Sequence, residues 1–155
     1  MPDLSITAGS VAPLTAGSGI VPTVTARGIA GTVIAPGQVV YADPSAGNLI
    51  KPAAASNQLQ ASNVVGIALG SAALNQPVTY AVSGDMQLQT TGGVGTGLTS
   101  GSVYILSVNA GSIVATADAL AAGNFVTPLG LGNGTATATT TNVFRLNIIP
   151  AAAQK

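Results

Sequence analysis

Residues 35–51 read APGQVVYADPSAGNLIK, and this stretch decides the fold class. Residues 38–42 are rich in β-branched and aromatic side chains, which is typical of a strand. Residues 43–47 contain aspartate, proline and glycine, the residue types that favour a tight turn. Residues 48–51 then supply a short returning strand. The stretch therefore predicts a β-hairpin.

A related hairpin pattern occurs 64 residues later in the chain. Residues 28–91 contain seven glycines and residues 92–155 contain ten. Chance placement predicts about one match at this offset, whereas six glycines match without a gap. Matched glycines indicate matched demands on the backbone. We therefore predict two duplicated β units, unit 1 (residues 28–91) and unit 2 (residues 92–155). The matched pairs are Gly28/Gly92, Gly31/Gly95, Gly37/Gly101, Gly47/Gly111, Gly66/Gly130 and Gly70/Gly134.

Apolar positions follow the same offset, with Val39 on Val103, Ile67 on Leu131 and Tyr80 on Phe144 among them. In unit 2 the hairpin strands are expected at residues 102–108 and 112–116. A second strand pair is expected in each unit, at 64–69 with 78–82 and at 126–131 with 143–148. The segments 52–62 and 118–122 are expected to be loops or short helical turns, and 92–97 and 130–134 tight turns.

Residues 1–27 lie outside the repeat and contain Pro2, Pro13 and Pro22. Proline this frequent argues against a central strand. The segment is nevertheless too apolar for a solvated tail, so we expect an extended arm that docks on another surface. The predicted fold is all-β: a small β-sandwich or barrel-like domain, built from two duplicated units that form one compact body, with an extended N-terminal arm.

Charge is scarce in this chain. Four basic and four acidic side chains give a formal net charge of zero, and glutamate is absent. The hydrophobic share of 47% and the mean hydropathy of +0.55 exclude the composition of a disordered protein. A neutral β protein cannot protect its sheet edges with lysines, so burial of those edges in an assembly is expected. The charged residues are Asp3, Arg27, Asp43, Lys51, Asp85, Asp118, Arg145 and Lys155.

The residue types needed for common catalytic sites are missing. Without histidine or cysteine the chain cannot form a Ser-His-Asp or Cys-His arrangement, nor the usual zinc or haem ligands. Asp43 and Asp85 are interpreted as turn residues; the alternative is a two-carboxylate glycosidase that uses Asp43 with Asp85 or Asp118. We predict no enzyme, no cofactor and no catalytic residue.

Calcium is the metal that suits this composition best, with Asp43, Ser45 and Asn48 as a partial cage. The ligand density of a dedicated calcium loop is absent, so no metal site is predicted. Two arginines and two lysines cannot form the basic stripe of a nucleic-acid-binding protein. Because the longest apolar stretch, residues 64–74, is too short to cross a bilayer, no membrane partner is predicted either.

Three phrases of the chain resemble those of tailed-bacteriophage head decoration proteins, also called capsid cement proteins. They are APGQVVY at residues 35–41, NVVGIA at residues 63–68 and LTSGSVYILS at residues 98–107. The resemblance covers most of residues 30–130, and its motifs mark strands rather than an active site. It implies a β-rich protein on the capsid exterior, a homotrimer, that stabilises the shell by bridging copies of the major capsid protein.

The alternative function is a tail-fibre or receptor-binding module that binds a surface or a carbohydrate. Sugar-binding surfaces use exposed tryptophan or tyrosine, and this chain has no tryptophan. No secretory signal is recognised at the N-terminus, so the expected place of synthesis is the host cytoplasm and the expected destination is the virion.

Overall fold

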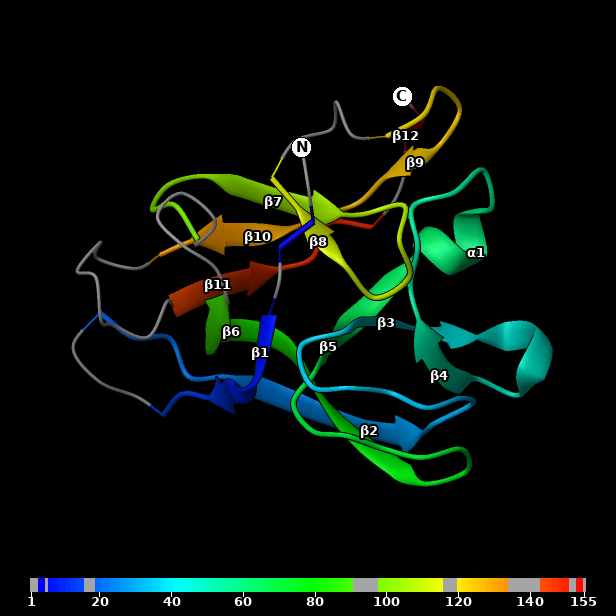
Figure 1. Ribbon diagram of the computed structural model, residues 1–155, viewed down its shortest axis with the longest axis horizontal. Coiled ribbons are helices and arrows are strands. Elements are labelled where there is room, and N and C mark those ends of the chain that lie inside the picture. Colours follow the sequence, from blue (N-terminus) through cyan, green and yellow to red (C-terminus); the bar gives the residue numbers. More distant parts are fainter. Residues whose placement is uncertain are drawn as a thin grey trace.

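The computed structural model describes residues 3–4, 6–15, 19–90, 98–115, 120–133, 143–150 and 153–154. Strands make up 50% of the chain and helices 6%, so the predicted all-β class is confirmed. A curled antiparallel sheet forms a half-barrel (Figure 1). The elements are β1 (Ile6–Pro13), β2 (Val24–Ile29), β3 (Val39–Asp43), a 3₁₀ turn (Pro44–Ala46), β4 (Leu49–Pro52), α1 (Leu59–Ser62), β5 (Val64–Ala68), β6 (Pro77–Thr90), β7 (Val103–Leu106), β8 (Ile113–Val114), β9 (Phe125–Val126), β10 (Pro128–Gly132), β11 (Val143–Asn147) and β12 (Ala153–Gln154).

The long strand β6 organises the sheet. Ser83 pairs with Val24 of β2 on one edge and with Asn147 of β11 on the other. The strands β2 and β1 follow one another along the first edge, and β5 and β11 follow one another along the second. Strands β3 and β4 continue the sheet beyond β5, and β10, β7 and β8 continue it beyond β11. The sheet therefore splits into two branches at β6. Figure 1 shows β11 and β5 on one side of β6 and β1 and β2 on the other.

Strand pairing recurs at the 64-residue offset. Gly37 N donates to Ala68 O at 2.8 Å, and Gly101 N donates to Gly132 O at 2.8 Å. The chain thus uses one pairing scheme twice, and the repeat seen in the glycines is present in the ladders. The pairs Val39–Ile67, Val40–Gly66, Tyr41–Val64, Ile67–Ala81 and Ala68–Tyr80 recur as Val103–Leu131, Tyr104–Gly130, Ile105–Pro128, Leu131–Arg145 and Gly132–Phe144.

Two of the matched glycines have the same physical role. A Cβ atom on Gly66 would overlap the carbonyl oxygen of Ala81, and one on Gly130 would overlap that of Arg145. Ala81 and Arg145 are themselves 64 residues apart. Glycine at these positions therefore permits close approach of neighbouring strands, which explains why glycine occurs in the interior of β5 and of β10.

The two hairpins differ in register by one residue. Ala42 pairs with Ile50 in unit 1, whereas Leu106 pairs with Ile113 rather than Val114 in unit 2. Asp43 lies at the end of the first hairpin, pairs with Leu49 and accepts a hydrogen bond from Ser45 N. Its counterpart Ser107 instead donates its hydroxyl to Asp3. The equivalent residues Asp43 and Ser107 therefore bind different parts of the chain: Asp43 binds its own turn, and Ser107 binds the N-terminal segment.

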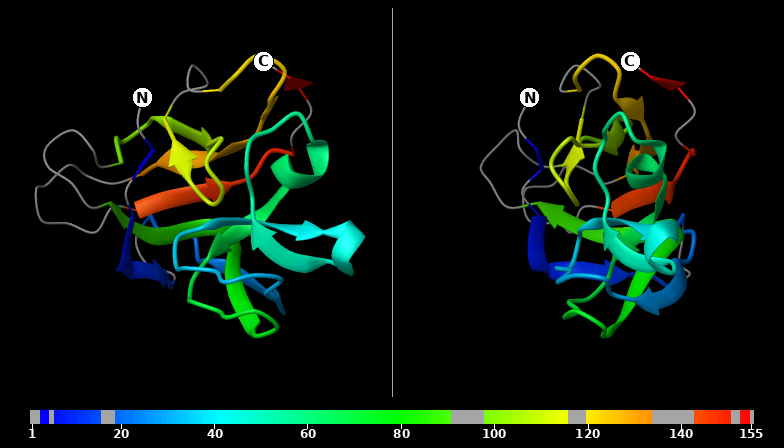
Figure 2. Two further views of the ribbon diagram at one scale, coloured as in Figure 1. Left: turned by 45° about the vertical axis from the view of Figure 1, so that its right-hand side comes forward. Right: turned by 90° about the vertical axis from the view of Figure 1, so that its right-hand side faces the viewer.

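The predicted arm has its partner within the same chain. Strand β1 and the first four residues of β2 pair with β6, and Leu4 N donates to Ile113 O at 2.9 Å. The boundary drawn after residue 27 falls inside β2, which continues to Ile29. Without these strands one edge of β6 would be open, and a covered edge is more stable. In Figure 2 both views place β1, in dark blue, just beneath one end of the green β6.

The sheet of unit 1 is buried on both faces. Val40, Ala68 and Tyr80 point into a smaller cluster with Ala30 and Ile34. The alternate residues of the same strands, Val39, Ile67 and Ala81, belong to the main core with unit 2, which is formed there by Tyr104, Phe144, Leu146 and others. Packing between the units is therefore sheet face on sheet face.

Candidate functional site

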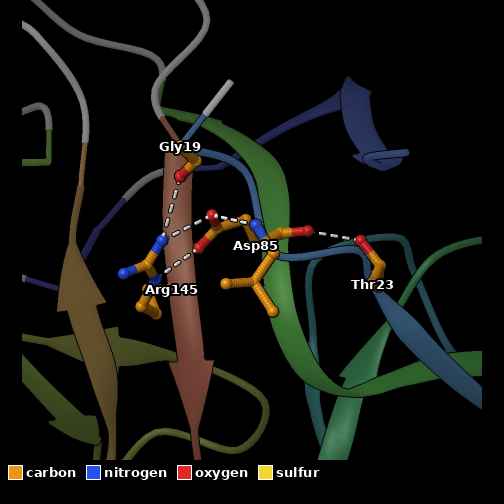
Figure 3. A network of polar contacts seen from close by, with 5 residues as sticks. Gly19, Thr23, Asp85 and Arg145 are labelled. Carbon is orange, nitrogen blue, oxygen red and sulfur yellow. Dashed lines mark hydrogen bonds and ion pairs between the residues drawn. The ribbon is translucent and has the colours of Figure 1, made fainter. Parts of the chain in front are cut away.

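The strongest polar feature is an ion pair at the junction of the units. Asp85 on β6 is fully buried and faces Arg145 on β11, directly opposite in the ladder. Arg145 Nε lies 2.7 Å from Asp85 Oδ1 and Nη2 lies 2.8 Å from Oδ2, a bidentate geometry. Figure 3 shows the guanidinium reaching from β11 to the carboxylate on β6.

The same aspartate fastens the segment before β2. Val21 N donates to Asp85 Oδ2 at 2.9 Å, and Asp85 N donates to Val21 O at 2.8 Å. Thr23 Oγ1 donates to Asp85 O, and Arg145 Nη2 donates to Gly19 O at 3.3 Å. Gly84, with φ of +91°, allows this segment to approach, because a side chain there would overlap Pro22 O.

This arrangement stabilises structure and leaves little capacity for chemistry. The carboxylate of Asp85 accepts three hydrogen bonds and is shielded from solvent. The hydrogen bond from Arg145 is the main cause that lowers the pKa of Asp85, opposed by burial, so the group stays ionised at neutral pH. A general acid needs a raised pKa and access to substrate. We call the Asp85–Arg145 pair with residues 19–23 the clamp.

Interpretation of Asp85 as a turn residue was wrong, since it lies within β6. Gly84 suggested a turn, but the strand continues through it because the glycine accommodates a neighbouring backbone. Arg145 was missed as its partner. The sequence signal that could have found the pair is that Asp85 and Arg145 are each the one charged residue in their strand, in a chain with eight charged residues in all.

Asp43 is confirmed as a residue that caps its own turn. Its Oδ1 accepts from Ser45 N at 2.9 Å and from Ser45 Oγ at 2.6 Å. Its Oδ2 accepts from Lys51 Nζ at 2.7 Å. The hydrogen bonds from Lys51, first, and from Ser45 lower the pKa of Asp43 to about 2. Lys51 thus neutralises the one carboxylate in the partial calcium cage of Asp43, Ser45 and Asn48, and the Ser45 hydroxyl donates to that carboxylate.

Other candidate residues divide between structural roles and the undescribed part of the chain. Asp3 accepts from Ser107 Oγ and, at 2.6 Å, from Asn109 Nδ2, and so fastens the N-terminal segment to the second hairpin. Asp118 and residues 92–97 lie outside the described residues. The tight turn expected at 130–134 is wrong for residues 130–132, which belong to β10. Asp43 and Asp85 are each tied to a basic residue of their own.

An apolar surface remains on the sheet of unit 2. Val103, Leu131 and Ile149 are 50%, 41% and 54% exposed. Together with Pro128, Arg145 and Asn147 they line a shallow open groove of about 240 Å³. Isolated exposed apolar residues are ordinary, whereas large contiguous apolar patches are typical of binding surfaces.

Within the described residues no three acidic, histidine or cysteine side chains gather as a metal site would require. The same part of the chain contains no helix long and apolar enough to span a membrane. Comparison with protein-family models, curated proteins and solved structures finds no match.

Proposed function

We propose that this protein is a structural virion component that binds the exterior of a bacteriophage capsid and stabilises it by bridging major capsid protein subunits. It works as a homo-oligomer, for which the sequence resemblance suggests a trimer, and it catalyses no reaction. The observation that carries the proposal is the set of three phrases at residues 35–41, 63–68 and 98–107. A β-rich domain with a contiguous apolar surface is compatible with such a role.

The use made of the carboxylates supports a structural role. Asp3, Asp43 and Asp85 each hold two segments of the chain together, as their hydrogen bonds show. A catalytic carboxylate must instead face a site that admits substrate. These three residues contribute to keeping a small half-barrel rigid, which is what a protein that carries load between subunits requires.

The aromatic residues bear on the alternative, a carbohydrate-binding fibre module. All five are described: Tyr80, Tyr104 and Phe144 are buried, and Tyr41 and Phe125 are half-buried. Sugar recognition by stacking needs an open aromatic face. The arrangement therefore favours the capsid role over sugar binding.

Bridging is assigned to the folded body rather than to a free arm. Ile6, residues 11–13 and residues 24–27 pair with β6, so the backbone groups of these residues that face β6 are already used within the chain. Many copies on one shell gain avidity, so each contact can be modest. Binding only to the assembled shell stabilises that shell by mass action.

The test is deletion of the gene from the phage or prophage genome that encodes it. We expect mass spectrometry to find the protein in purified wild-type particles. Particles without it should release DNA at lower temperature or after milder osmotic shock, and added purified protein should restore resistance. Particles that stay equally robust but adsorb poorly to cells would overturn the proposal in favour of receptor binding.

A further inference from the structure

Strand β2 has an outer edge, opposite to the edge that pairs with β6. In an antiparallel ladder, alternate residues direct their N–H and C=O groups toward the neighbouring strand, and the residues between them direct theirs away. Just beyond the ladder Ala30 N donates to Gln76 O at 2.8 Å, so residues 26 and 28 face β6 as well. The backbone groups of Thr25 and Arg27 therefore point away from β6, and we call these groups the open edge.

Two further contacts fix the extent of the open edge. Arg27 lies opposite Thr79, and Thr79 O accepts a hydrogen bond of 3.0 Å from Leu69 N, on the side of β5. The backbone of Thr79 thus faces away from β2, as the alternation requires. After β2 the outer edge is occupied, because Gly31 N donates to Ile50 O at 2.8 Å. Among the described residues, no strand pairs with the open edge itself.

The side chains of β2 alternate in the same way. Ala26 packs against the smaller core cluster, and a Cβ atom on Gly28 would overlap a side chain of that cluster. The side chains of Thr25, Arg27 and Ile29 lie on the opposite face, where all three are exposed. A strand added at the open edge would therefore place its own side chains beside one hydroxyl, one guanidinium and one aliphatic group.

Arg27 is the described basic residue that forms no ion pair within the chain. Lys51 and Arg145 each bind an aspartate. The three described aspartates are in turn all held by side chains of their own chain. A second copy therefore has no free carboxylate among its described residues to offer Arg27, and its own β2 carries the same positive charge. The group that suits Arg27 is an aspartate or glutamate side chain of a different protein.

We infer that the open edge of β2 receives an extended polypeptide segment of a different protein, which adds as a further strand and places an acidic side chain beside Arg27. Thr25 and Arg27 each offer one N–H and one C=O at the spacing of a strand, a pattern that another main chain matches. In strand addition the main-chain hydrogen bonds supply affinity, and alternate side chains supply specificity. The charge of Arg27 disfavours basic strands and so selects the partner. The inference rests on the proposed function, under which the partner is a capsid subunit, and it names the surface and the chemistry of that contact.

Binding to particles that lack this protein, purified from the gene-deletion phage, tests the backbone part of the inference. Thr25→Pro removes an outward N–H while the hydrogen bonds to β6 and the charge of Arg27 remain, as proline on an edge strand allows. We expect this variant to cosediment with the particles at least about tenfold more weakly than the wild type, because one hydrogen bond is lost and the ring occupies its place. The matched control Thr25→Val keeps the N–H and should bind like the wild type.

Variants of Arg27 test the charge. Arg27→Glu should bind at least about tenfold more weakly than the wild type, because two carboxylates then lie side by side. Arg27→Lys keeps the charge and should retain most of the binding. If either Thr25→Pro or Arg27→Glu binds like the wild type, the inference is overturned and the proposed function stands. A wild type that does not bind the particles would overturn the proposed function and the inference with it.

Hydrogen exchange keeps the test decisive if Thr25→Pro does not fold. In the isolated wild-type protein, NMR should find that the amides of Thr25 and Arg27 exchange severalfold faster than those of Ala26 and Gly28. On particles the exchange of residues 24–29, followed by mass spectrometry, should slow severalfold. An Arg27 amide that is already protected in the isolated protein, or a segment whose exchange does not change on particles, overturns the inference.

Discussion

At the residue scale the clamp shows how a chain with few charges uses them. Asp85 connects β6, β11 and residues 19–23, which are brought together from three separate parts of the sequence. A buried carboxylate is stable there because Arg145 and Val21 N supply hydrogen bonds that replace those of water. The residue therefore fixes the junction between units, and its removal leaves an uncompensated guanidinium beside apolar side chains.

Asp85→Asn is expected to lower the free energy of unfolding by about 2–3 kcal/mol. The amide group places a donor opposite either Arg145 or Val21 N, so at least one hydrogen bond is lost. Urea unfolding at neutral pH measures the effect. Asp43→Asn, which affects a pair whose lysine is partly exposed, is the control and should cost less, because the asparagine oxygen can still accept the turn hydrogen bond from Ser45 N. Equal losses would show that the clamp has no special role.

Asp43 gives a pH-dependent contribution to stability. Its pKa is about 2 in the folded chain against an ordinary value of 3.8, mainly because of Lys51. A group whose pKa is lowered by folding stabilises the protein above its unfolded pKa, and this contribution is lost as pH falls through the folded value. The difference in unfolding free energy between wild type and Asp43→Asn should therefore be constant above about pH 5 and shrink between pH 3.8 and 2.

Unfolding curves at a series of pH values measure that difference, and Lys51→Met should reproduce its pH dependence. Some acid sensitivity should remain in both variants, because Arg145 also lowers the pKa of Asp85. A difference that does not vary with pH would mean that the Asp43–Lys51 pair is not formed in solution.

At the element scale the two units depend on close strand contacts at equivalent glycines. Gly66→Ala and Gly130→Ala should each destabilise the protein by about 1–3 kcal/mol, because the added methyl group overlaps a backbone carbonyl that cannot move without breaking the ladder. Gly70→Ala is the matched control, since no atom lies within 4 Å of the position that its methyl group would take and its φ is ordinary. Thermal unfolding of the three variants gives the comparison; similar melting temperatures would rule out the steric role.

At the scale of the whole molecule the N-terminal residues complete the half-barrel. Strand β1 covers residues 86–90 of β6, and Leu4, Ile6 and Val11 pack against the main core. Their removal would expose both a strand edge and apolar area. Edges of this kind promote aggregation, which is a further reason for the chain to cover its own edge.

A variant that lacks residues 2–13 should melt more than about 5 °C below the full chain and aggregate more readily. Calorimetry and light scattering measure both effects. A synthetic peptide of residues 1–13 should restore part of the stability in a concentration-dependent manner. An unchanged melting temperature would mean that β1 contributes little to the fold and would return the segment to consideration as an external anchor.

The amino-acid sequence was sufficient to predict the all-β class, the hairpin at residues 35–51, the 64-residue repeat and the capping role of Asp43. These features depend on local patterns, namely alternation along strands, turn residues and the spacing of glycines. The three-dimensional arrangement was needed to show that β6 continues through Gly84, that Asp85 pairs with Arg145, that β1 pairs with β6 and that Val103, Leu131 and Ile149 of unit 2 are exposed. Each of these depends on partners distant in sequence. In the sequence Gly84 is indistinguishable from a turn glycine, because the backbone segment that approaches it is distant in the chain. The repeat gives both units the same apolar pattern, but packing of one unit on the other buries Val39 and Ile67 of unit 1 and leaves their equivalents Val103 and Leu131 of unit 2 exposed.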